Sequence, residues 1–353
     1  MSEAVVVRGL SKVYKVRKLT GRWARDLLSF RWTEVHALRE VRFSVNPGEA
    51  VAYVGPNGAG KSTTIKILAG VLRPTEGDVA VFGRDPFRHR ISNAHNIGVV
   101  FGQRTQLWWE LPVIDSYRMI ARIYDVPPSA LRTRIEAATD LLGLEKLLQR
   151  PVRTLSLGEK MRAELGSVLL HGPRLLLLDE PTLGVDLAGK RRIRQFLAEL
   201  KKTGVTVFLA THDLADVEST CDRIIMVHQG RIVLDGSVAD LLASFGHDIT
   251  VQFADERVDA GRLREALGRD VTESNGRFVI HGDGLEPSPA VVERLFGLAK
   301  VADISITAPN LEFVIGSIYD SLQHDSSQPQ SRLKLQRGPG SQGGKNACEH
   351  TPG

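Results

Sequence analysis

The sequence predicts an α/β protein with a phosphate-binding loop, followed by a small α+β domain. Segments with strand and helix patterns alternate over residues 1 to about 240, as in a sheet covered by helices. A glycine-rich stretch, "GPNGAGKS" at 55–62, separates a strand pattern from a helix pattern. From about residue 245 shorter elements follow in a βαββαβ-like order.

The composition is that of a globular protein, with 42% hydrophobic and 25% charged residues in a chain of 353. No apolar run approaches the roughly 20 residues that a membrane-spanning helix needs. The charged N-terminus lacks the apolar core of a signal peptide. The two cysteines, Cys221 and Cys348, lie far apart in the sequence and form no metal-binding pattern. We therefore expect a cytosolic protein with reduced thiols.

The expected strands of the first part are short apolar runs. They are "AVVVRG", "VRFSV", "AVAYV", "DVAVFG", "IGVVF", "RLLLLD", "TVFLAT" and "RIIMVH". A hairpin turn is expected at Gln229-Gly230. Residues 107–170 have mostly helical patterns, and "ALRTRIEAATDLLGLEKLL" is the clearest amphipathic stretch.

A basic segment lies near the N-terminus, within a predicted insertion at about 15–34. Residues 12–31 carry seven Lys and Arg side chains against the single Asp26. The simplest interpretation is a solvated loop. Anionic lipid or nucleic acid are alternative partners. Aromatic residues such as Trp23 and Trp32 also allow a short amphipathic helix at a membrane or against a partner protein.

The spacing G-x-x-x-x-G-K-[ST] predicts a nucleotide-phosphate site. Glycines let several backbone N–H groups face one concavity, and the following helix adds the partial positive charge of its N-terminus. We expect Lys61 to reach the β- and γ-phosphates and Ser62 to coordinate Mg²⁺. The expected nucleotide-binding residues of this segment are Gly55, Asn57, Gly58, Gly60, Lys61, Ser62 and Thr63.

Two carboxylates follow a run of leucines in "RLLLLDEPTLGVD". The run predicts a central parallel strand, which would place Asp179 and Glu180 at the sheet edge where α/β proteins bind ligands. We expect Asp179 to hold Mg²⁺ and Glu180 to orient or deprotonate the attacking water.

A second anion-binding helix start is expected in "TLSLGEKMRAEL", at 154–165. Ser156 and Gly158 open a helix there, although a helix capped by serine is by itself commonplace.

The order of the motifs is the phosphate loop, "LSLGE", "LLLLDEP" and "ATHD", and it resembles the nucleotide-binding subunit of an ATP-binding cassette (ABC) transporter over residues 1 to about 240. The resemblance implies a P-loop NTPase fold with a RecA-like core, an antiparallel β subdomain and a helical subdomain. It also implies that two subunits hold two ATP molecules head to tail. "LSLGE" is similar to the family signature LSGGQ, which contacts the γ-phosphate of the opposing subunit's ATP. Leu157 and Glu159 depart from that signature.

The resemblance implies further site residues. His212 in "FLATHD" matches the switch histidine that contacts the γ-phosphate, and Asp186 in "LGVD" matches the loop that crosses the dimer interface. Tyr14 matches the aromatic residue that stacks on adenine. The glutamine of the Q-loop is Gln103 or Gln106, and we prefer Gln103 as a catalytic and metal-binding residue.

The segments "VVFGQRTQLWWELP", "LSLGEKMRAEL" and "APNLEFVIGSIYDSL" resemble a subgroup of bacterial exporter ATPases with separate membrane subunits. In this interpretation Trp108 and Trp109 either face a partner or belong to the core of the helical subdomain. The resemblance implies an ATP hydrolase that uses ATP and Mg²⁺, works as a homo- or heterodimer, and binds permease chains at the cytoplasmic face of the inner (plasma) membrane. No nucleic acid is expected.

Three regions follow from these patterns. Residues 1–243 are the predicted ABC ATPase domain, with its helical subdomain at about 104–170, and 244–323 are the small α+β accessory domain. The tail at 324–353 is rich in Gly, Pro, Ser and Gln and is expected to be disordered.

Two alternatives come from other functional classes. A soluble ABC ATPase acting on ribosomes or nucleic acid suits the basic segment, but the chain holds one cassette where such proteins usually hold two. A GTP switch protein would need a guanine-binding Asn-Lys-x-Asp stretch, which the sequence lacks. The sequence does not indicate which substrate is transported.

Overall fold

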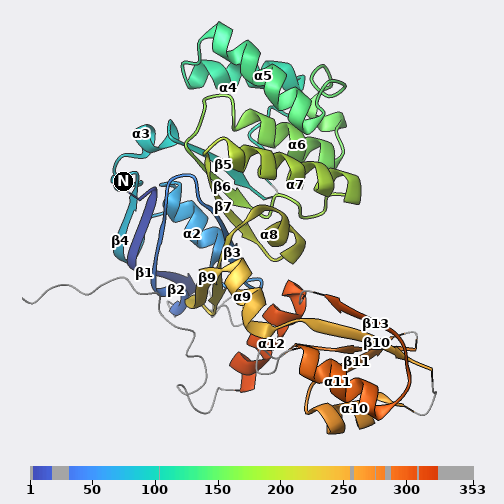
Figure 1. The fold of residues 1–353 in the computed structure, drawn as a ribbon. Helices are drawn as coiled ribbons and strands as arrows, with labels where there is room; N and C mark the ends of the chain where they lie inside the picture. The colour runs from blue at the N-terminus through green and yellow to red at the C-terminus, as the bar shows by residue number, and fades with distance from the viewer. Residues whose placement is uncertain are drawn as a thin grey trace, which may run out of the picture. The chain divides into compact units, whose positions relative to one another are not determined.

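The computed structural model describes residues 3–17, 32–102, 104–254, 258–274, 276–282, 288–307 and 310–324, and Figure 1 shows their fold. The chain divides into two units, Met1–Leu311 and Glu312–Gly353. The described part of the second unit is the helix α12 (Leu311–His324), which begins at the boundary. All other elements belong to the first unit.

A six-stranded sheet lies at the centre of the N-terminal part, in the order β5-β6-β7-β3-β8-β9. Its first five strands run parallel, and β9 pairs antiparallel with β8. Every residue of β3, β6 and β7 is buried, which explains their uninterrupted apolar runs. The strands are β3 (Ala50–Val54), β5 (Ile97–Phe101), β6 (Leu175–Asp179), β7 (Thr206–Thr211), β8 (Arg223–His228) and β9 (Arg231–Ser237).

The turn between β8 and β9 is the predicted hairpin turn. Gln229 has φ +48° and Gly230 has φ +77°, which is the pair of left-handed residues that the twist of a two-residue hairpin favours.

A second, antiparallel sheet has the order β2-β1-β4 and consists of β1 (Val5–Arg17), β2 (Trp32–Val45) and β4 (Glu76–Val81). Its first two strands are longer than the runs "AVVVRG" and "VRFSV" predicted. They stay paired as far as Arg17 and Trp32, because backbone ladder bonds continue where the side chains become charged. Both ends of the predicted insertion at 15–34 are therefore strand, while 18–31, including Trp23, lie outside the described residues.

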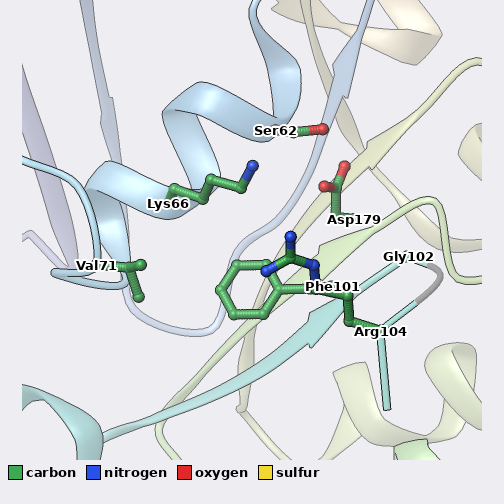
Figure 2. A pocket seen from close by; sticks show the side chains of 7 residues that line it. All are labelled: Ser62, Lys66, Val71, Phe101, Gly102, Arg104 and Asp179. Carbon is green, nitrogen blue, oxygen red and sulfur yellow. The ribbon is translucent and has the colours of Figure 1, made fainter.

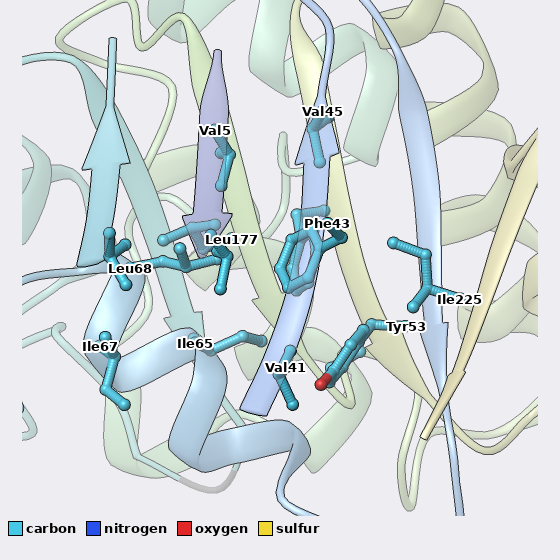
Figure 3. Close-up of a cluster of buried hydrophobic side chains, with 14 of the residues drawn as sticks. Val5, Val41, Phe43, Val45, Tyr53, Ile65, Ile67, Leu68, Leu177 and Ile225 are labelled. Carbon is cyan, nitrogen blue, oxygen red and sulfur yellow. The ribbon is translucent and has the colours of Figure 1, made fainter. Parts of the chain in front are cut away.

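The two sheets and the helix α2 (Lys61–Leu68) share one hydrophobic core, shown in Figure 3. Three aromatic rings lie at its centre. The ring of Tyr53 is 5.9 Å from that of Phe43 and 5.2 Å from that of Phe208, and the latter two are 5.7 Å apart. Such ring pairs add to the free energy of area burial. They fix the strand that leads into the glycine-rich loop.

A helical segment follows β5, as predicted, and is drawn in green in Figure 1. Pro127 precedes its second helix and Pro128 occupies the first helical position, where its missing N–H costs no hydrogen bond. Its helices are α4 (Val113–Ile123), α5 (Pro128–Leu142), a 3₁₀ turn (Val152–Thr154) and α6 (Leu157–Ser167). The remaining helices of the N-terminal part are α3 (Arg90–Ala94), α7 (Leu187–Lys202), α8 (Leu214–Thr220) and α9 (Val238–Phe245).

The predicted βαββαβ order is found after α9. The elements are β10 (Asp248–Phe253), α10 (Ala260–Leu267), β11 (Val271–Ser274), β12 (Arg277–Ile280), α11 (Ser288–Leu298) and β13 (Val301–Thr307). The strands form an antiparallel sheet in the order β11-β12-β10-β13, which has its own hydrophobic cluster. The domain boundaries at 243 and 323 stay predictions, and the predicted disordered tail lies outside the described residues apart from its first residue.

Candidate active site

The glycine-rich loop connects β3 to α2. Gly58 and Gly60 have φ values of +81° and +107°, which other residues rarely adopt. A Cβ atom on Gly55 would lie 2.4 Å from the carbonyl oxygen of Val227, so only glycine fits there. No side chain among the described residues caps the N-terminus of α2. Its first N–H groups are therefore available to an anion.

Lys61 lies at the start of α2 and is 6% exposed. Its Nζ donates to the carbonyl oxygen of Gly55 at 2.6 Å and lies 3.4 Å from that of Pro56. Nζ is also 3.2 Å from Oε1 of Glu180. The buried ammonium is thus held by the loop on one side and by a carboxylate on the other.

Glu180 follows β6 in a left-handed conformation with φ +53°. Its N–H donates to the carbonyl oxygen of Ala210 at 2.9 Å, which fixes the turn against the neighbouring strand β7. His212 follows β7, and its Nδ1 is 2.8 Å from Oε2 of Glu180. The structure therefore brings Lys61 and His212 together at the carboxylate of Glu180.

Asp179 is the last residue of β6 and is 8% exposed. Its Oδ1 is buried and has no hydrogen-bond partner among the described residues. Burial raises the pKa of Asp179 and the nearby Glu180 raises it further, while a hydrogen bond with Ser62 and the charges of Lys61 and Lys66 act in the opposite direction. A buried carboxylate oxygen without a partner in the described part of the chain, beside a hydroxyl, supplies oxygen ligands of the kind that a hard cation such as Mg²⁺ takes.

Ser62 and Asp179 face one cavity of about 240 Å³, shown in Figure 2. Lys66 of α2 and Arg104 also line it, and the guanidinium of Arg104 points into it. Neither cation was predicted as a site residue. Lys66 follows the predicted site residue Ser62 by four positions, so the two share one face of α2, which was a usable signal, whereas nothing in the sequence singled out Arg104.

The start of α6 is held by a capping box. The N–H of Glu159 donates to Oγ of Ser156 at 3.2 Å, and the N–H of Ser156 donates to Oε2 of Glu159 at 2.8 Å. Arg150 also donates to Glu159, at 3.0 Å. Glu159, a departure from the family signature, thus stabilises this helix start. Leu157, the other departure, is 47% exposed.

Gly158 lies against the loop that carries Asp186. A Cβ atom on Gly158 would be 3.2 Å from Oδ1 of Asp186, which itself caps α7 by accepting from the N–H of Gly189 at 3.1 Å. The predicted signature and the predicted interface aspartate are therefore neighbours within one chain.

Tyr14 lies on β1, beside the first turn of α2. Its hydroxyl is 3.4 Å from Oγ1 of Thr63, and Nζ of Lys12 lies 5.4 Å from the centre of its ring. The ring is thus next to the phosphate loop, and the expected stacking on adenine stays a prediction. Asn57 is exposed in the same loop.

The preferred Q-loop residue, Gln103, lies outside the described residues. The alternative, Gln106, donates from Nε2 to the carbonyl oxygen of Val99 at 2.6 Å and lines a different cavity, of about 230 Å³.

The side chain of Trp109 is 51% exposed. Nζ of Lys160 lies 4.2 Å from the centre of its ring, in a cation–π contact.

An ionic network supports the segments that carry Glu180 and His212, and sequence reasoning missed it. Asp213 accepts from Lys190 at 2.7 Å and from Arg194 at 3.2 Å. Arg194 also donates to the buried Asp216 at 2.6 Å, which accepts from the hydroxyl of Thr182. Asp216 on α8 therefore connects the turn after β6, through Thr182, to α7, through Arg194.

Comparisons with known proteins agree with this geometry. A family model described as "ABC transporter" matches residues 38–183. The chain is 30% identical over 210 residues to the ABC transporter ATP-binding protein NatA of Bacillus subtilis (strain 168), covering 60% of this chain and 85% of the relative. It is 31% identical over 215 residues to the linearmycin resistance ATP-binding protein LnrL of the same organism, covering 61% and 69%.

Among solved structures, a dimeric post-hydrolysis state of the ATP-binding cassette MJ0796, bound to ADP and Pi, is similar. Its TM-score is 0.57 and its identity is 25%, over 66% of this chain and 98% of that one.

The fold and site define a P-loop ATPase of the ABC class. The chain belongs to the family of ABC transporter ATP-binding proteins. It is an ATP-binding and ATP-hydrolysing subunit of an ABC transporter, as the sequence predicted. Within the described residues, no helix combines the length and apolar character needed to cross a membrane.

Proposed function

We propose that this chain powers an exporter from the cytoplasmic face of a membrane and drives permease subunits in separate chains. The observation that carries the hydrolytic part is the convergence of Lys61 and His212 on Glu180. Nζ of Lys61 lies 3.2 Å from one carboxylate oxygen of Glu180, and Nδ1 of His212 lies 2.8 Å from the other. The three residues stand in the segments that follow the adjacent parallel strands β3, β6 and β7. Ligands bind at that edge of α/β sheets.

Lys61 has two partners in the structure that the phosphates of ATP can replace. Nζ of Lys61 binds the Gly55 carbonyl and the Glu180 carboxylate. A triphosphate in the loop offers the ammonium more negative acceptors, so Lys61 turns to the β- and γ-phosphates. Glu180 is then released to orient or deprotonate water, while His212 holds its other oxygen.

Ser62 and Asp179 are the residues that we propose to hold Mg²⁺. The support is the buried Oδ1 of Asp179, which has no hydrogen-bond partner in the described part of the chain and lies next to the Ser62 hydroxyl in the cavity of Figure 2. Gln103 is proposed as a further ligand from the sequence alone. When bound, Mg²⁺ supplies positive charge that stabilises the phosphate oxygens.

Pairing of two subunits, as homo- or heterodimer, completes the proposed site. We assign Ser156 and Gly158 to the γ-phosphate of the ATP held by the other subunit, and Asp186 to the interface. The support is the pre-ordered start of α6, where the capping box fixes Ser156 and leaves further N–H groups for an anion. Tyr14 is assigned to the adenine ring.

The membrane partner and the direction of transport rest on similarity. LnrL is named for resistance to linearmycin, and the subgroup resemblance indicates export. The half-exposed Trp109 is a candidate anchor for the permease.

The test is to express a tagged Glu180→Gln variant in the native host, trap it with ATP, and identify what co-purifies from solubilised membranes and from cytosol. A stoichiometric multi-span membrane protein is expected. Ribosomes or nucleic acid without a membrane partner would contradict the proposal.

Direction is tested by comparing metabolites in cells and medium after the variant replaces the parent. Export predicts a compound that accumulates in cells and is depleted in the medium, and the opposite distribution indicates import.

A further inference from the structure

Glu164 is a buried carboxylate in the middle of α6, and the proposed nucleotide site makes no use of it. It is 3% exposed and forms no ion pair with a described residue. Burial raises its pKa, and hydrogen bonds from the chain oppose that shift. A buried carboxyl group is costly unless donors surround it, so the position of those donors is informative.

The donors come from one loop, between β5 and α4. Oγ1 of Thr105 donates to Oε2 of Glu164 at 2.6 Å, and the N–H of Gln106 donates to Oε1 at 2.8 Å. The N–H of Leu107 donates to Oγ1 of Thr105 at 3.1 Å, so the same hydroxyl is held on both sides. Glu164 therefore fastens the body of α6 to the loop at 104–107 through Thr105 and Gln106.

Backbone hydrogen bonds from both sides of residue 103 lead to residues that line the proposed nucleotide cavity. The N–H of Gly102 donates to the carbonyl oxygen of Asp179 at 2.9 Å, and that of Arg104 donates to the Phe101 carbonyl at 2.7 Å. Gly102 and Arg104 line the same cavity as Asp179 (Figure 2). The loop after β5 therefore contacts the proposed metal ligand Asp179 through Gly102 and contacts Glu164 through Thr105.

The helix α6 begins with the proposed signature. Ser156 is its N-cap and Gly158 lies in its first turn. The hydroxyl of Tyr117 on α4 donates to the Ala163 carbonyl at 2.7 Å, so α6 is also bound to the rest of the helical segment. Any displacement of 104–107 on nucleotide binding would therefore act on a helix whose start is proposed to contact a second subunit.

We propose that Glu164 is a positioning residue that makes the start of α6 follow the loop at 104–107 and so places Ser156 and Gly158 for pairing. This inference rests on the assignment of Ser156 and Gly158 under the proposed function. Neither Thr105 nor Glu164 lines the cavity beside Ser62 and Asp179. Loss of the contact is expected to weaken ATP-driven pairing and to spare ATP binding by a single subunit.

The test uses the full chain with Glu180→Gln as the parent, so that bound ATP persists. Glu164→Leu removes every acceptor at similar side-chain volume. Thr105→Val removes one donor to Glu164, together with the acceptor of the Leu107 N–H, at an exposed position, which keeps the test valid if the buried substitution unfolds the chain. Ser167→Ala is the matched control, because its hydroxyl is buried on α6 but donates only to the Glu164 carbonyl, at 2.7 Å.

Sedimentation with saturating ATP gives the dimer dissociation constant, and a fluorescent ATP analogue at dilute protein gives the affinity of the single subunit. Glu164→Leu is expected to raise the dimer dissociation constant by about tenfold or more and Thr105→Val by somewhat less, since hydrogen bonds to a charged group are lost. Affinity for the analogue should stay within about twofold of the parent. The double variant should be no weaker than Glu164→Leu, because both changes break the same contact.

The inference would be overturned if Thr105→Val, and Glu164→Leu where it folds, had the same dimer dissociation constant as the parent and the Ser167→Ala control. That result would leave the proposed function intact. An equal loss of analogue binding and pairing would overturn it as well. A parent that does not pair with ATP would refute the proposed pairing itself, and the inference with it.

Discussion

Nδ1 of His212 lies 2.8 Å from Oε2 of Glu180, and the two residues follow the adjacent parallel strands β7 and β6. The contact holds the carboxylate in one orientation. His212→Ala should therefore lower turnover about 10²- to 10⁴-fold, the usual range for a lost proton-transfer arrangement. Phosphate release measures this loss. His89→Ala, at an exposed histidine elsewhere, should leave turnover unchanged, and full turnover by His212→Ala would contradict the arrangement.

Lys61→Ala should reduce the affinity for ATP at least about tenfold, because the loop loses its buried cation. Equilibrium binding of a fluorescent ATP analogue measures the change. Lys146→Ala, which removes an exposed lysine from the helical segment, is the control for net charge. An unchanged affinity in Lys61→Ala would show that the glycine loop does not hold the phosphates.

Asp179→Asn should raise the Mg²⁺ concentration needed for half-maximal turnover, since a neutral amide replaces a carboxylate whose Oδ1 has no partner among the residues that the structure describes. Binding of the analogue in EDTA should change little. A Mg²⁺ requirement identical to that of the parent would remove Asp179 from the proposed metal site.

The lowered pKa of Asp213 predicts that the folded protein loses free energy of unfolding in acid. Burial acts to raise its pKa, but the hydrogen bond and charge of Lys190 and the charge of Arg194 prevail, so its pKa lies below the ordinary value of 3.8. The unfolded chain then takes up the proton first, and the stabilisation is present above pH 3.8 and lost as the pH falls through the lowered pKa.

Asp213→Asn should lower the free energy of unfolding by about 1–3 kcal/mol at pH 7, with a difference that shrinks in acid. Urea unfolding of both proteins between pH 7 and pH 3 measures it. A difference that grows on acidification would have the wrong sign for this account.

The phosphate loop was predictable because a fixed spacing between a strand and a helix determines which backbone groups meet. The Asp179-Glu180 pair was predictable for a similar reason, since a run of buried leucines ends there at the sheet edge. The contact of Lys61 with Glu180 was not, because it depends on side-chain rotamers and on the left-handed backbone of Glu180. The roles assigned to Tyr14, Gln103 and the signature stay predictions.

Polar residues with tertiary roles were the main omission. Arg104 and Glu164 stand in segments whose patterns indicate only a loop and a helix, and their positions follow from how β5, β6 and α6 pack. The extended pairing of β1 with β2 was missed for a related reason: backbone bonds continue the ladder where no apolar alternation marks it.

Glu180→Gln tests the central claim most directly, because it removes one charge and keeps the shape of the side chain. The measurement is steady-state phosphate release with equilibrium ATP binding on the same preparation. The account predicts that turnover falls at least about 100-fold while ATP affinity is retained. Full turnover in Glu180→Gln would contradict the assignment of this carboxylate to the attacking water.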